Sequence, residues 1–337
     1  MRSHAAERAS ISPIPGVGKP AMRDLVSTRD LSPAEVRSIL DLAAVVKARP
    51  ADFRKTLDGK QLVMFFEKPS LRTRLTFEAG MSSLGGTAFF MDQTGGRIDA
   101  RESLHDIARN VERWVDVIVL RTFAHSTVED MAMHASIPVI NALSDLEHPC
   151  QALADYSVLQ ERFGNLKNVT LAFVGDGNNV AHSLLLTGAM LGSHVRVATP
   201  KGYEPNAEIV SAAHEIALGT GATVEVLTDP YEAVSGADAV YTDAWTSMGQ
   251  ENEAQARRLI FQPYQVNDDL MAEAAPHALF MHCLPAHRAE EVTNSVMDSP
   301  QSVIFDQAEG RLHVQKAILM LLLWGGASRF PVRSAHA

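Results

Sequence analysis

Two arginines and two hydroxyl side chains crowd into the short segment KPSLRTR, residues 68–74. The segment follows an apolar run and opens an amphipathic one, as the start of a helix after a strand would. The first turn of a helix offers unpaired backbone N–H groups and the positive end of its dipole, which favour an anion. Ser70 suits the N-cap, and the forked guanidinium groups of Arg72 and Arg74 match phosphate oxygens. The segment predicts a phosphate site; a capped helix start with solvated arginines is the alternative.

Arg121, His148 and Gln151 form a second set of groups suited to a small charged substrate. Arg121 follows a strand-like run, so it is expected at the same sheet edge as the arginine segment, where it could complete a phosphate clamp. His148 and Gln151 lie three positions apart at a predicted helix start and face the same side. An imidazole and a carboxamide there could polarise or hold a carbonyl group. A surface ion pair for Arg121 and a helix cap for His148 are the alternatives.

Three more strand ends carry polar side chains. The segment GDGNN, residues 175–179, stands where a dinucleotide-binding loop would, but Val180 occupies the place of the third glycine, which disfavours a nicotinamide cofactor. Its asparagines suit the amine and carboxylate of an amino acid. Asp243 could bind a cationic substrate or cap a turn. Cys283 follows the last of these strands, where a buried thiol, a substrate contact and a nucleophile are all compatible with the pattern.

Short apolar runs alternate along the chain with amphipathic helical runs, and these elements must position the polar side chains. The alternation predicts an α/β fold: two doubly wound parallel-sheet domains with the active site in the cleft between them. The expected strands are residues 62–66, 88–91, 115–120, 138–140, 169–174, 194–198, 223–227, 239–242, 278–281 and 303–305. The expected helices are residues 33–47, 71–84, 103–114, 127–135, 149–163, 180–191, 206–218 and about 309–324.

The length of 337 residues fits two domains of ordinary size. Residues 1–22, rich in Ser, Pro, Gly and Ala, are expected to be a disordered extension. We expect one domain at 23–155, a second at 156–311, and a helix at about 312–330 that packs back on the first.

The formal net charge of −10 argues against nucleic acid or an anionic membrane as a partner. The chain has only two cysteines, Cys150 and Cys283, which excludes a disulfide framework and fits a reducing cytoplasm. No apolar run reaches the length of a membrane span. The bulk composition therefore predicts a cytoplasmic protein that acts on small molecules.

Six segments, taken in order, resemble the aspartate/ornithine carbamoyltransferase family, and specifically its ornithine-using members. They are FEKPSLRTR, HPCQALAD, VGDGNNVAHS, DAWTSMG, HCLPAHR and FDQAEGRLHVQKA, and the resemblance runs from about residue 23 to the C-terminal helix. It implies that the first domain binds carbamoyl phosphate and the second L-ornithine. The implied reaction is attack of the δ-amine on the carbamoyl carbon, giving L-citrulline and phosphate, as in arginine biosynthesis, with no metal or organic cofactor.

The resemblance also implies roles for individual residues. The carbamoyl phosphate site would consist of Ser70, Leu71, Arg72, Thr73, Arg121, His148, Gln151, Cys283, Leu284 and Arg311. The ornithine site would consist of Asn179, Asp243, Ser247 and Met248. Catalysis would fall to Arg72, Arg121, His148, Asp243 and Cys283. Family members are trimers or multiples of trimers, so a homotrimer is implied.

Two positions depart from the family pattern, which commonly has threonine at Leu71 and asparagine at Gly310. An apolar residue at position 71 keeps an N-acylated ornithine open as the substrate, beside putrescine and aspartate. A nucleotide-dependent dehydrogenase and a non-catalytic relative that kept the fold are the remaining alternatives. The sequence leaves an anabolic and a catabolic role equally compatible with this chemistry.

Overall fold

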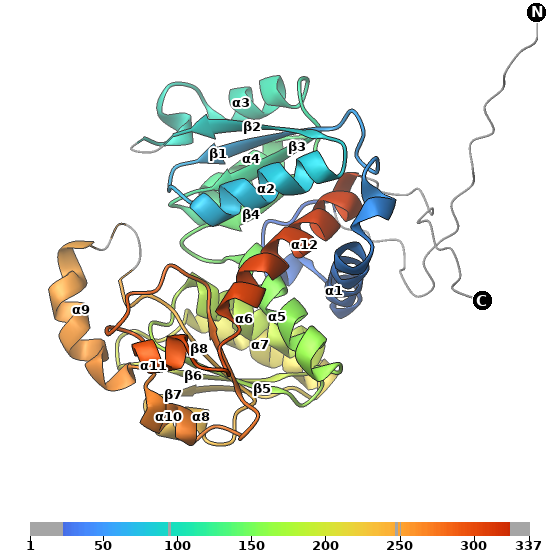
Figure 1. The fold of residues 1–337 in the computed structure, drawn as a ribbon. Helices are drawn as coiled ribbons and strands as arrows, with labels where there is room; N and C mark the ends of the chain where they lie inside the picture. The colour runs from blue at the N-terminus through green and yellow to red at the C-terminus, as the bar shows by residue number, and fades with distance from the viewer. Residues whose placement is uncertain (1–22, 94–95, 247–248, 250, 324–337) are drawn as a thin grey trace, which may run out of the picture.

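The computed structural model describes residues 23–323 apart from 94–95, 247–248 and 250. The predicted extension at 1–22, the predicted ornithine ligands Ser247 and Met248, and the chain after Leu323 lie outside the described residues. The described chain forms two parallel β-sheets with helices on both faces of each, so the predicted α/β fold is confirmed (Figure 1).

The first sheet has the strand order β2-β1-β3-β4, with all its pairings parallel. Its strands are β1 (Gln61–Phe66), β2 (Thr87–Asp92), β3 (Val117–Arg121) and β4 (Val139–Leu143). Apolar side chains on one face pack against α2 (Leu71–Ser83), and those on the other pack against α3 (Leu104–Val111) and α4 (His125–His134).

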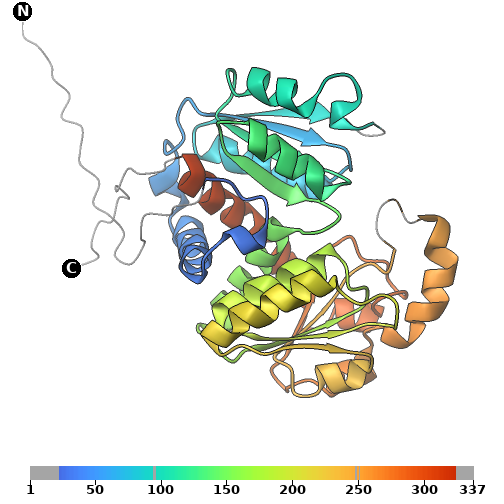
Figure 2. The same ribbon diagram turned by 180° about the vertical axis from the view of Figure 1, so that it is seen from behind.

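The second sheet has the order β7-β6-β5-β8-β9, again entirely parallel. Its strands are β5 (Thr170–Val174), β6 (His194–Ala198), β7 (Val224–Leu227), β8 (Ala239–Thr242) and β9 (Leu279–His282). The helices of this unit are α6 (Asn179–Leu191), α7 (Ala207–Thr220), α8 (Pro230–Val234), α9 (Ala254–Phe261), α10 (Asp268–Ala272) and α11 (Asn294–Met297). Helices α6 and α7 pack together over one face, as the view from behind shows (Figure 2).

The direction of strand addition reverses once in each sheet. The chain adds β2 on one side of β1 and then returns to place β3 on the other side, and it does the same with β6 and β8 around β5. At such a reversal the connections leave neighbouring strands toward opposite faces and open a crevice at the carboxyl edge. The loops that follow β1, β3, β5 and β8 are therefore where a ligand is expected.

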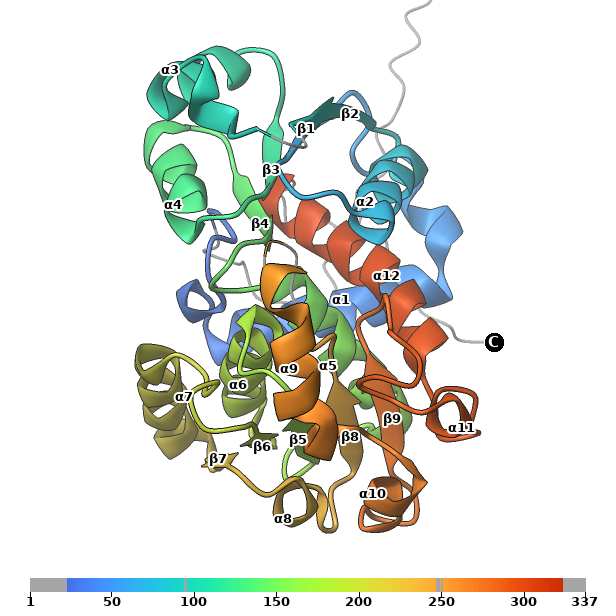
Figure 3. The ribbon, with the colours of Figure 1, turned by 90° about the vertical axis from the view of Figure 1, so that its left-hand side faces the viewer.

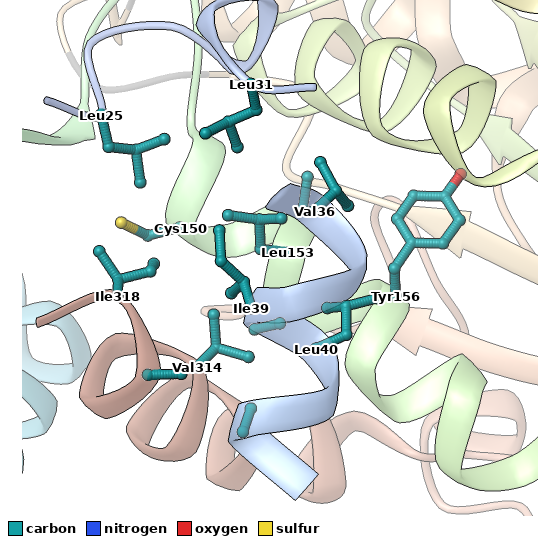
Figure 4. Packing of buried hydrophobic residues seen from close by; sticks show 14 of the residues in the cluster. Leu25, Leu31, Val36, Ile39, Leu40, Cys150, Leu153, Tyr156, Val314 and Ile318 are labelled. Atoms are coloured by element: carbon teal, nitrogen blue, oxygen red, sulfur yellow. The ribbon is translucent and has the colours of Figure 1, made fainter. Parts of the chain in front are cut away.

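Three helices join the two units: α1 (Pro33–Ala48), α5 (Pro149–Phe163) and α12 (Ile304–Leu323). Helix α12 packs against β9 in the second unit and against α1, α2 and α5, so it runs from one unit into the other (Figure 3). Apolar side chains of the three helices interlock, with the Cys150 thiol among them (Figure 4). Burial raises the pKa of the Cys150 thiol to about 12, as expected of a core residue.

The ends of two of these helices follow from local sequence. Ser32 caps α1 and accepts a hydrogen bond from the Glu35 N–H, while Pro33 occupies the first turn. Pro149 likewise occupies the first turn of α5. This helix is closed by Gly164, whose φ is 74°.

The predicted strand at 303–305 is wrong. Helix α12 already begins at Ile304, and only one isolated bridge, between Phe280 and Ser302, continues the sheet there. A short apolar run fits a buried helix start as well as a strand, so its periodicity could not separate the two. Among the described helices, none has both the length and the apolar content that a membrane span requires.

Candidate active site

A cleft of about 570 Å³ lies where the carboxyl edges of the two sheets meet α5 and α12. Most of the predicted site residues line it: Ser70, Leu71, Arg72, Arg121, His148, Gln151, Asn179, Asp243, Cys283, Leu284 and Arg311. These residues come from seven separate segments of the chain. Its volume is in the range of ordinary small-molecule sites, which is roughly 300–1,000 Å³.

The start of α2 forms one wall of the cleft. The Ser70 hydroxyl caps the helix by accepting a hydrogen bond from the Thr73 N–H at 3.2 Å, and it donates to Thr73 Oγ1 at 3.0 Å. The same Thr73 oxygen, buried beneath the wall, accepts a hydrogen bond from Arg311 Nη2 at 2.8 Å. The N–H groups of Leu71 and Arg72 are left at the positive end of the helix dipole, as an anion site needs.

Three guanidinium groups converge at this wall, those of Arg72, Arg121 and Arg311. Burial, followed by the nearby charge of Arg311, lowers the pKa of Arg121 to about 9. Burial likewise lowers the pKa of Arg311, with Arg72 adding to the effect. Within the described part of the chain, none of the three forms a salt bridge with a carboxylate; Arg121 instead donates to the Lys68 carbonyl at 3.2 Å. Such uncompensated, mutually repelling cations are stabilised when an anion binds between them.

Arg74 does not share this arrangement. Its Nε donates to the Glu78 carboxylate at 2.9 Å, and its guanidinium stacks on the Phe90 ring at 3.9 Å from the centroid. Of the two arginines in the first turn, only Arg72 lines the cleft. The two positions are separated by about 200° around the helix, which sends their side chains to different faces.

His148 and Gln151 lie at the floor of the cleft, at the start of α5. Burial, and then the charges of Arg311 and Arg121, hold the pKa of His148 well below its usual 6.5, so its imidazole is neutral at pH 7. Its Nδ1 has no hydrogen-bond partner in the described structure, whereas its backbone N–H donates to Ser183 Oγ at 2.9 Å. Gln151 Oε1 accepts a hydrogen bond from Arg311 Nη1 at 2.9 Å. The pair can therefore engage a neutral, polar group beside the anion site.

The opposite wall is built around the Asp243 carboxylate, directly after β8. It accepts hydrogen bonds from Asn178 Nδ2 and from the Cys283 thiol, both at 2.9 Å. Asn179 lines the cleft beside it and donates to the Ser144 carbonyl at 2.6 Å. Burial, followed by the negative charge of Asp243, raises the pKa of Cys283 well above 9. The thiol is thus protonated, which weighs against the nucleophile that the sequence left open.

The GDGNN loop uses its residues for packing and capping. A Cβ on Gly177 would lie 2.3 Å from the Pro205 nitrogen, so only glycine fits there. Asn178 occupies the N-cap of α6 and accepts hydrogen bonds from the N–H groups of Val180 and Ala181. In a dinucleotide-binding loop the N–H groups at this helix start would bind a pyrophosphate. Here the Asn178 side chain accepts hydrogen bonds from two of them instead.

Among the described residues, two groups of side chains lie close enough to ligate a metal: Asp243, His282 and Cys283, and His287, Glu290 and Glu291. Their members already have internal partners, since the Cys283 thiol meets Asp243, His282 Nε2 meets Glu291 at 3.2 Å, and Glu290 pairs with Arg258 at 2.6 Å. Nothing in these contacts favours a metal over the partners that are present.

Several residues at or beneath the cleft were not predicted from the sequence. Arg258, His287 and Glu290 line the cleft, and the Arg258–Glu290 ion pair closes one side of its mouth. No local pattern could have found them, because α9 and the loop after β9 meet only in the folded chain. Asp155, which lies beneath Gln151, was detectable as the next residue on the same helix face, four positions along.

The two departures from the family pattern have different surroundings. Leu71 is 71% exposed at the mouth of the cleft, so its side chain is free to meet a substrate or a second chain. Gly310 lies where α12 approaches α5 closely: a Cβ there would be 3.2 Å from a methyl group of Val158 and 3.4 Å from the Ala154 carbonyl. A larger residue at 310 would push these helices apart.

Comparison with known proteins matches both halves of the chain to family models. Residues 23–161 match the carbamoyl-P binding domain of aspartate/ornithine carbamoyltransferase, and residues 167–322 match the Asp/Orn binding domain of the same family. Together these matches cover most of the described residues.

Individual relatives agree. The chain is 50% identical over 310 residues to a protein of Pyrococcus abyssi named ornithine carbamoyltransferase, covering 91% of this chain and 98% of the relative. It is 50% identical over 307 residues (90% and 98%) to a Pyrococcus furiosus protein named ornithine carbamoyltransferase, anabolic. The solved structure of the P. furiosus ornithine carbamoyltransferase superposes with a TM-score of 0.89 at 50% identity, covering 92% of this chain and 99% of that one. The chain belongs to the aspartate/ornithine carbamoyltransferase family.

Proposed function

We propose that this protein is a transferase that moves the carbamoyl group of carbamoyl phosphate to the δ-amine of L-ornithine, giving L-citrulline and phosphate. The observation that carries the proposal is one cleft with two unlike walls. On one wall Arg72, Arg121 and Arg311 gather around the start of α2 with no carboxylate partner among the described residues, and the Asp243 carboxylate lies opposite. Relatives about half identical to this chain bear the name of this reaction. The word anabolic in one of those names favours a role in arginine biosynthesis.

The phosphate end of the first substrate would bind at the start of α2. The N–H groups of this helix start and the guanidinium groups of Arg72 and Arg121 would surround the phosphate oxygens, with Ser70 as the hydroxyl contact and the buried Thr73 hydroxyl supporting Ser70 and Arg311 from beneath. The negative charge on the phosphate grows as its bond to the carbamoyl group breaks. Fixed donors that are already aimed at this group would stabilise the transition state more than the substrate.

The carbamoyl group would lie next to the phosphate, over His148 and Gln151. A neutral imidazole can donate to the carbonyl oxygen, and Arg311, which Gln151 holds in place, adds positive charge there. The backbone at Cys283 and Leu284 would form hydrogen bonds with the carbamoyl amide. Leu284 has a φ of 60°, a left-handed conformation that points its peptide groups differently from those of a continuing strand.

Ornithine would approach from the second unit, held by Asn179 and Asp243; Ser247 and Met248 are the further proposed contacts. The δ-amine resembles that of lysine, with an intrinsic pKa near 10.4, and it must lose a proton before it attacks. Asp243 would bind the ammonium form and keep the amine beside the carbamoyl carbon. Holding both substrates in line between two units would supply much of the rate enhancement.

The deciding experiment measures citrulline after carbamoyl phosphate and L-ornithine are mixed with the protein. N-acetylornithine, putrescine and aspartate serve as competing acceptors, because the exposed Leu71 leaves an acylated substrate to be tested. We expect ornithine to be preferred by about 10⁴-fold or more in kcat/KM, the size expected when a site pairs a buried polar group of its substrate. A higher kcat/KM for any of the other amines would reassign the substrate, and no product from any of them would overturn the transferase.

We also propose that the protein assembles as a homotrimer or a multiple of one. An apolar groove of about 1,020 Å³ lies on the first unit, away from the cleft, and includes Phe89, Met91 and Trp114, all of them exposed. Trp114 is 68% exposed, and large apolar patches of this kind commonly mark interfaces between chains. Light scattering should give about three times the 36.6 kDa of one chain, and Trp114→Glu should lower that mass. A monomeric wild-type protein would refute this assembly.

We assign carbamoyl phosphate to residues 23–155 and ornithine to 156–311, and the packing of α12 against α1 and α2 supports its return to the first unit. A cytoplasmic location is supported by the two free thiols, Cys150 and Cys283. The proposed chemistry uses the chain's own side chains and calls for neither a metal nor an organic cofactor.

A further inference from the structure

Asp155 lies outside the cleft, one helical turn after Gln151 on α5, and it is fully buried. Its Oδ1 accepts two hydrogen bonds, from Gln151 Nε2 at 2.8 Å and from Gln307 Nε2 at 2.9 Å. Gln307 in turn accepts a hydrogen bond at its Oε1 from the backbone N–H of His282 at 2.8 Å. One carboxylate oxygen therefore connects three parts of the chain: α5, the first turn of α12 and the end of β9.

Both ends of the Gln151 carboxamide are defined by charged partners. Its oxygen faces the Arg311 guanidinium at 2.9 Å, and its NH₂ group faces the Asp155 carboxylate. A rotation of the amide by 180° would place NH₂ against the cation and oxygen against the anion, which is unfavourable at both ends. The lone pair of Gln151 Oε1 that Arg311 does not use is thereby kept as an acceptor at the floor of the cleft.

Gln307 also links Asp155 to the backbone before Cys283 and Leu284, the other proposed contact of the carbamoyl group. His282 precedes Cys283 and Leu284, and its backbone N–H is held by Gln307, whose own orientation is fixed by its donation to Asp155. Without that acceptor the Gln307 amide would also be free to rotate, and the end of β9 would lose its tether to α12.

We propose that Asp155 is a positioning residue for carbamoyl phosphate: it fixes the amide of Gln151 directly and the strand end before Cys283 through Gln307. The inference rests on the proposed function, because it assumes that Gln151 and Leu284 meet the carbamoyl group. Asp155 itself touches no substrate. What matters is the acceptor oxygen at Oδ1. The proposed ornithine contacts Asn179 and Asp243 make no hydrogen bond to Asp155, Gln151 or Gln307, so ornithine binding should depend on this oxygen far less.

The test compares Asp155→Leu with Asp155→Asn. Leucine fills the buried space without an acceptor, whereas asparagine keeps an oxygen that can accept from both glutamines. We expect Asp155→Leu to raise KM for carbamoyl phosphate on the order of tenfold to hundredfold, the usual consequence of a misplaced contact, with KM for ornithine changed by less than about threefold. Asp155→Asn should restore KM for carbamoyl phosphate to within about threefold of the wild-type value.

Two further variants separate positioning from stability. Gln307→Leu removes one arm of the network and should raise KM for carbamoyl phosphate several-fold, which keeps the test open if Asp155→Leu does not fold. Tyr156→Phe is the matched control, because Tyr156 is the next residue of α5 and its buried hydroxyl donates to the Leu184 carbonyl at 3.2 Å, away from Gln151. It should lower the melting temperature and leave both KM values unchanged.

The inference is overturned if Asp155→Leu or Gln307→Leu folds with an unchanged KM for carbamoyl phosphate, or if the KM values for both substrates rise equally. Failure of the proposed function looks different, because the wild-type protein would then form no citrulline. Isothermal titration with inorganic phosphate supplies a check without turnover: Asp155→Leu should bind phosphate as the wild-type protein does, since Arg72 and Arg121 are untouched.

Discussion

Arg72 and Arg74 show how much two positions decide at the start of a helix. The amino-acid types alone favoured both as phosphate ligands, but Arg72 lines the cleft while Arg74 pairs with Glu78 and stacks on Phe90. The difference comes from the helical period, which turns successive side chains by 100°. The same helix turn therefore places one arginine at the cleft and another of the same chemistry in an ion pair outside it.

This pair provides a controlled test of the phosphate site. Arg72→Ala should raise KM for carbamoyl phosphate and lower kcat, together reducing kcat/KM on the order of 10²-fold or more, because a donor to the developing phosphate charge is lost. Arg74→Ala should change kcat/KM by less than about threefold, because it removes only an exposed ion pair and a ring contact. Steady-state kinetics of both variants would contradict the assignment if the two losses were equal.

Cys283 illustrates a residue whose type suggested more than one chemistry. Its thiol donates to Asp243, and burial together with that carboxylate keeps its pKa well above 9. Cys283→Ser preserves a donor to Asp243, so we expect turnover to persist with a raised KM for ornithine. Mass spectrometry after incubation with carbamoyl phosphate should find no thiocarbamate on Cys283. A covalent adduct, or complete loss of turnover in Cys283→Ser, would restore the nucleophilic thiol.

Asp155 also predicts a pH effect on stability. Burial raises its pKa from 3.8 to about 6, against hydrogen bonds from Gln307 and Gln151 that lower it. The folded protein thus binds this proton more tightly than the unfolded chain, so its contribution to the unfolding free energy is complete below pH 3.8 and is lost as pH rises through about 6. Urea unfolding should show the wild-type protein losing stability relative to Asp155→Asn across that interval. Parallel pH profiles of the two proteins would contradict the raised pKa.

Helix α9 packs on the second unit through the buried side chains of Arg257 and Phe261. Arg257 forms an ion pair with Asp176 of the GDGNN loop, donates to the Trp245 carbonyl at 2.5 Å and lies over the Tyr203 and Phe261 rings. Burial raises the pKa of Asp176 to about 6, although Arg257 opposes the shift. The arginine therefore ties together the two loops that carry the proposed ornithine contacts Asn179 and Asp243.

Removing this arginine should lower the stability of the folded protein. Arg257→Met leaves the Asp176 carboxylate buried without a partner, and we expect a loss of about 3–5 kcal/mol in unfolding free energy. Adding Asp176→Asn should recover part of that loss, because the unpaired charge is removed as well. Denaturant titrations of the single and double variants measure both numbers. Simple additivity, with the double variant less stable than Arg257→Met, would show that the pair is not coupled.

At the scale of the whole molecule, the two units share a core. One cluster of buried apolar side chains includes Leu62 and Met64 of the first sheet, Leu171 and Phe173 of the second, and the residues of α1, α5 and α12 between them. The cleft lies directly on this shared core, because α5 and α12 also carry Gln151 and Arg311. The proposed substrate sites of the two units are thereby held in a fixed relation to one another.

A shared core predicts cooperative unfolding. Differential scanning calorimetry of the wild-type protein should show one transition rather than two, since neither sheet keeps its buried face when α5 or α12 leaves. Carbamoyl phosphate, or inorganic phosphate as its stable substitute, should raise the melting temperature of this single transition by mass action. Two separate transitions, with only the first unit stabilised by phosphate, would indicate independent domains.

The sequence by itself determined the α/β fold, the capped helix start that we propose as the phosphate site, and most of the residues that line the cleft. Those features are local: strand and helix periods, a cap such as Ser70, and polar residues at strand ends depend on residues that are close together in the sequence. The strand predicted at residues 303–305 was wrong, because a short apolar run fits a buried helix as well as a strand. Only the tertiary structure brought Arg311 to Thr73, 238 positions away, and Gln307 to Asp155, 152 positions away. Contacts at such separations depend on how whole helices pack, and no local pattern contains that information.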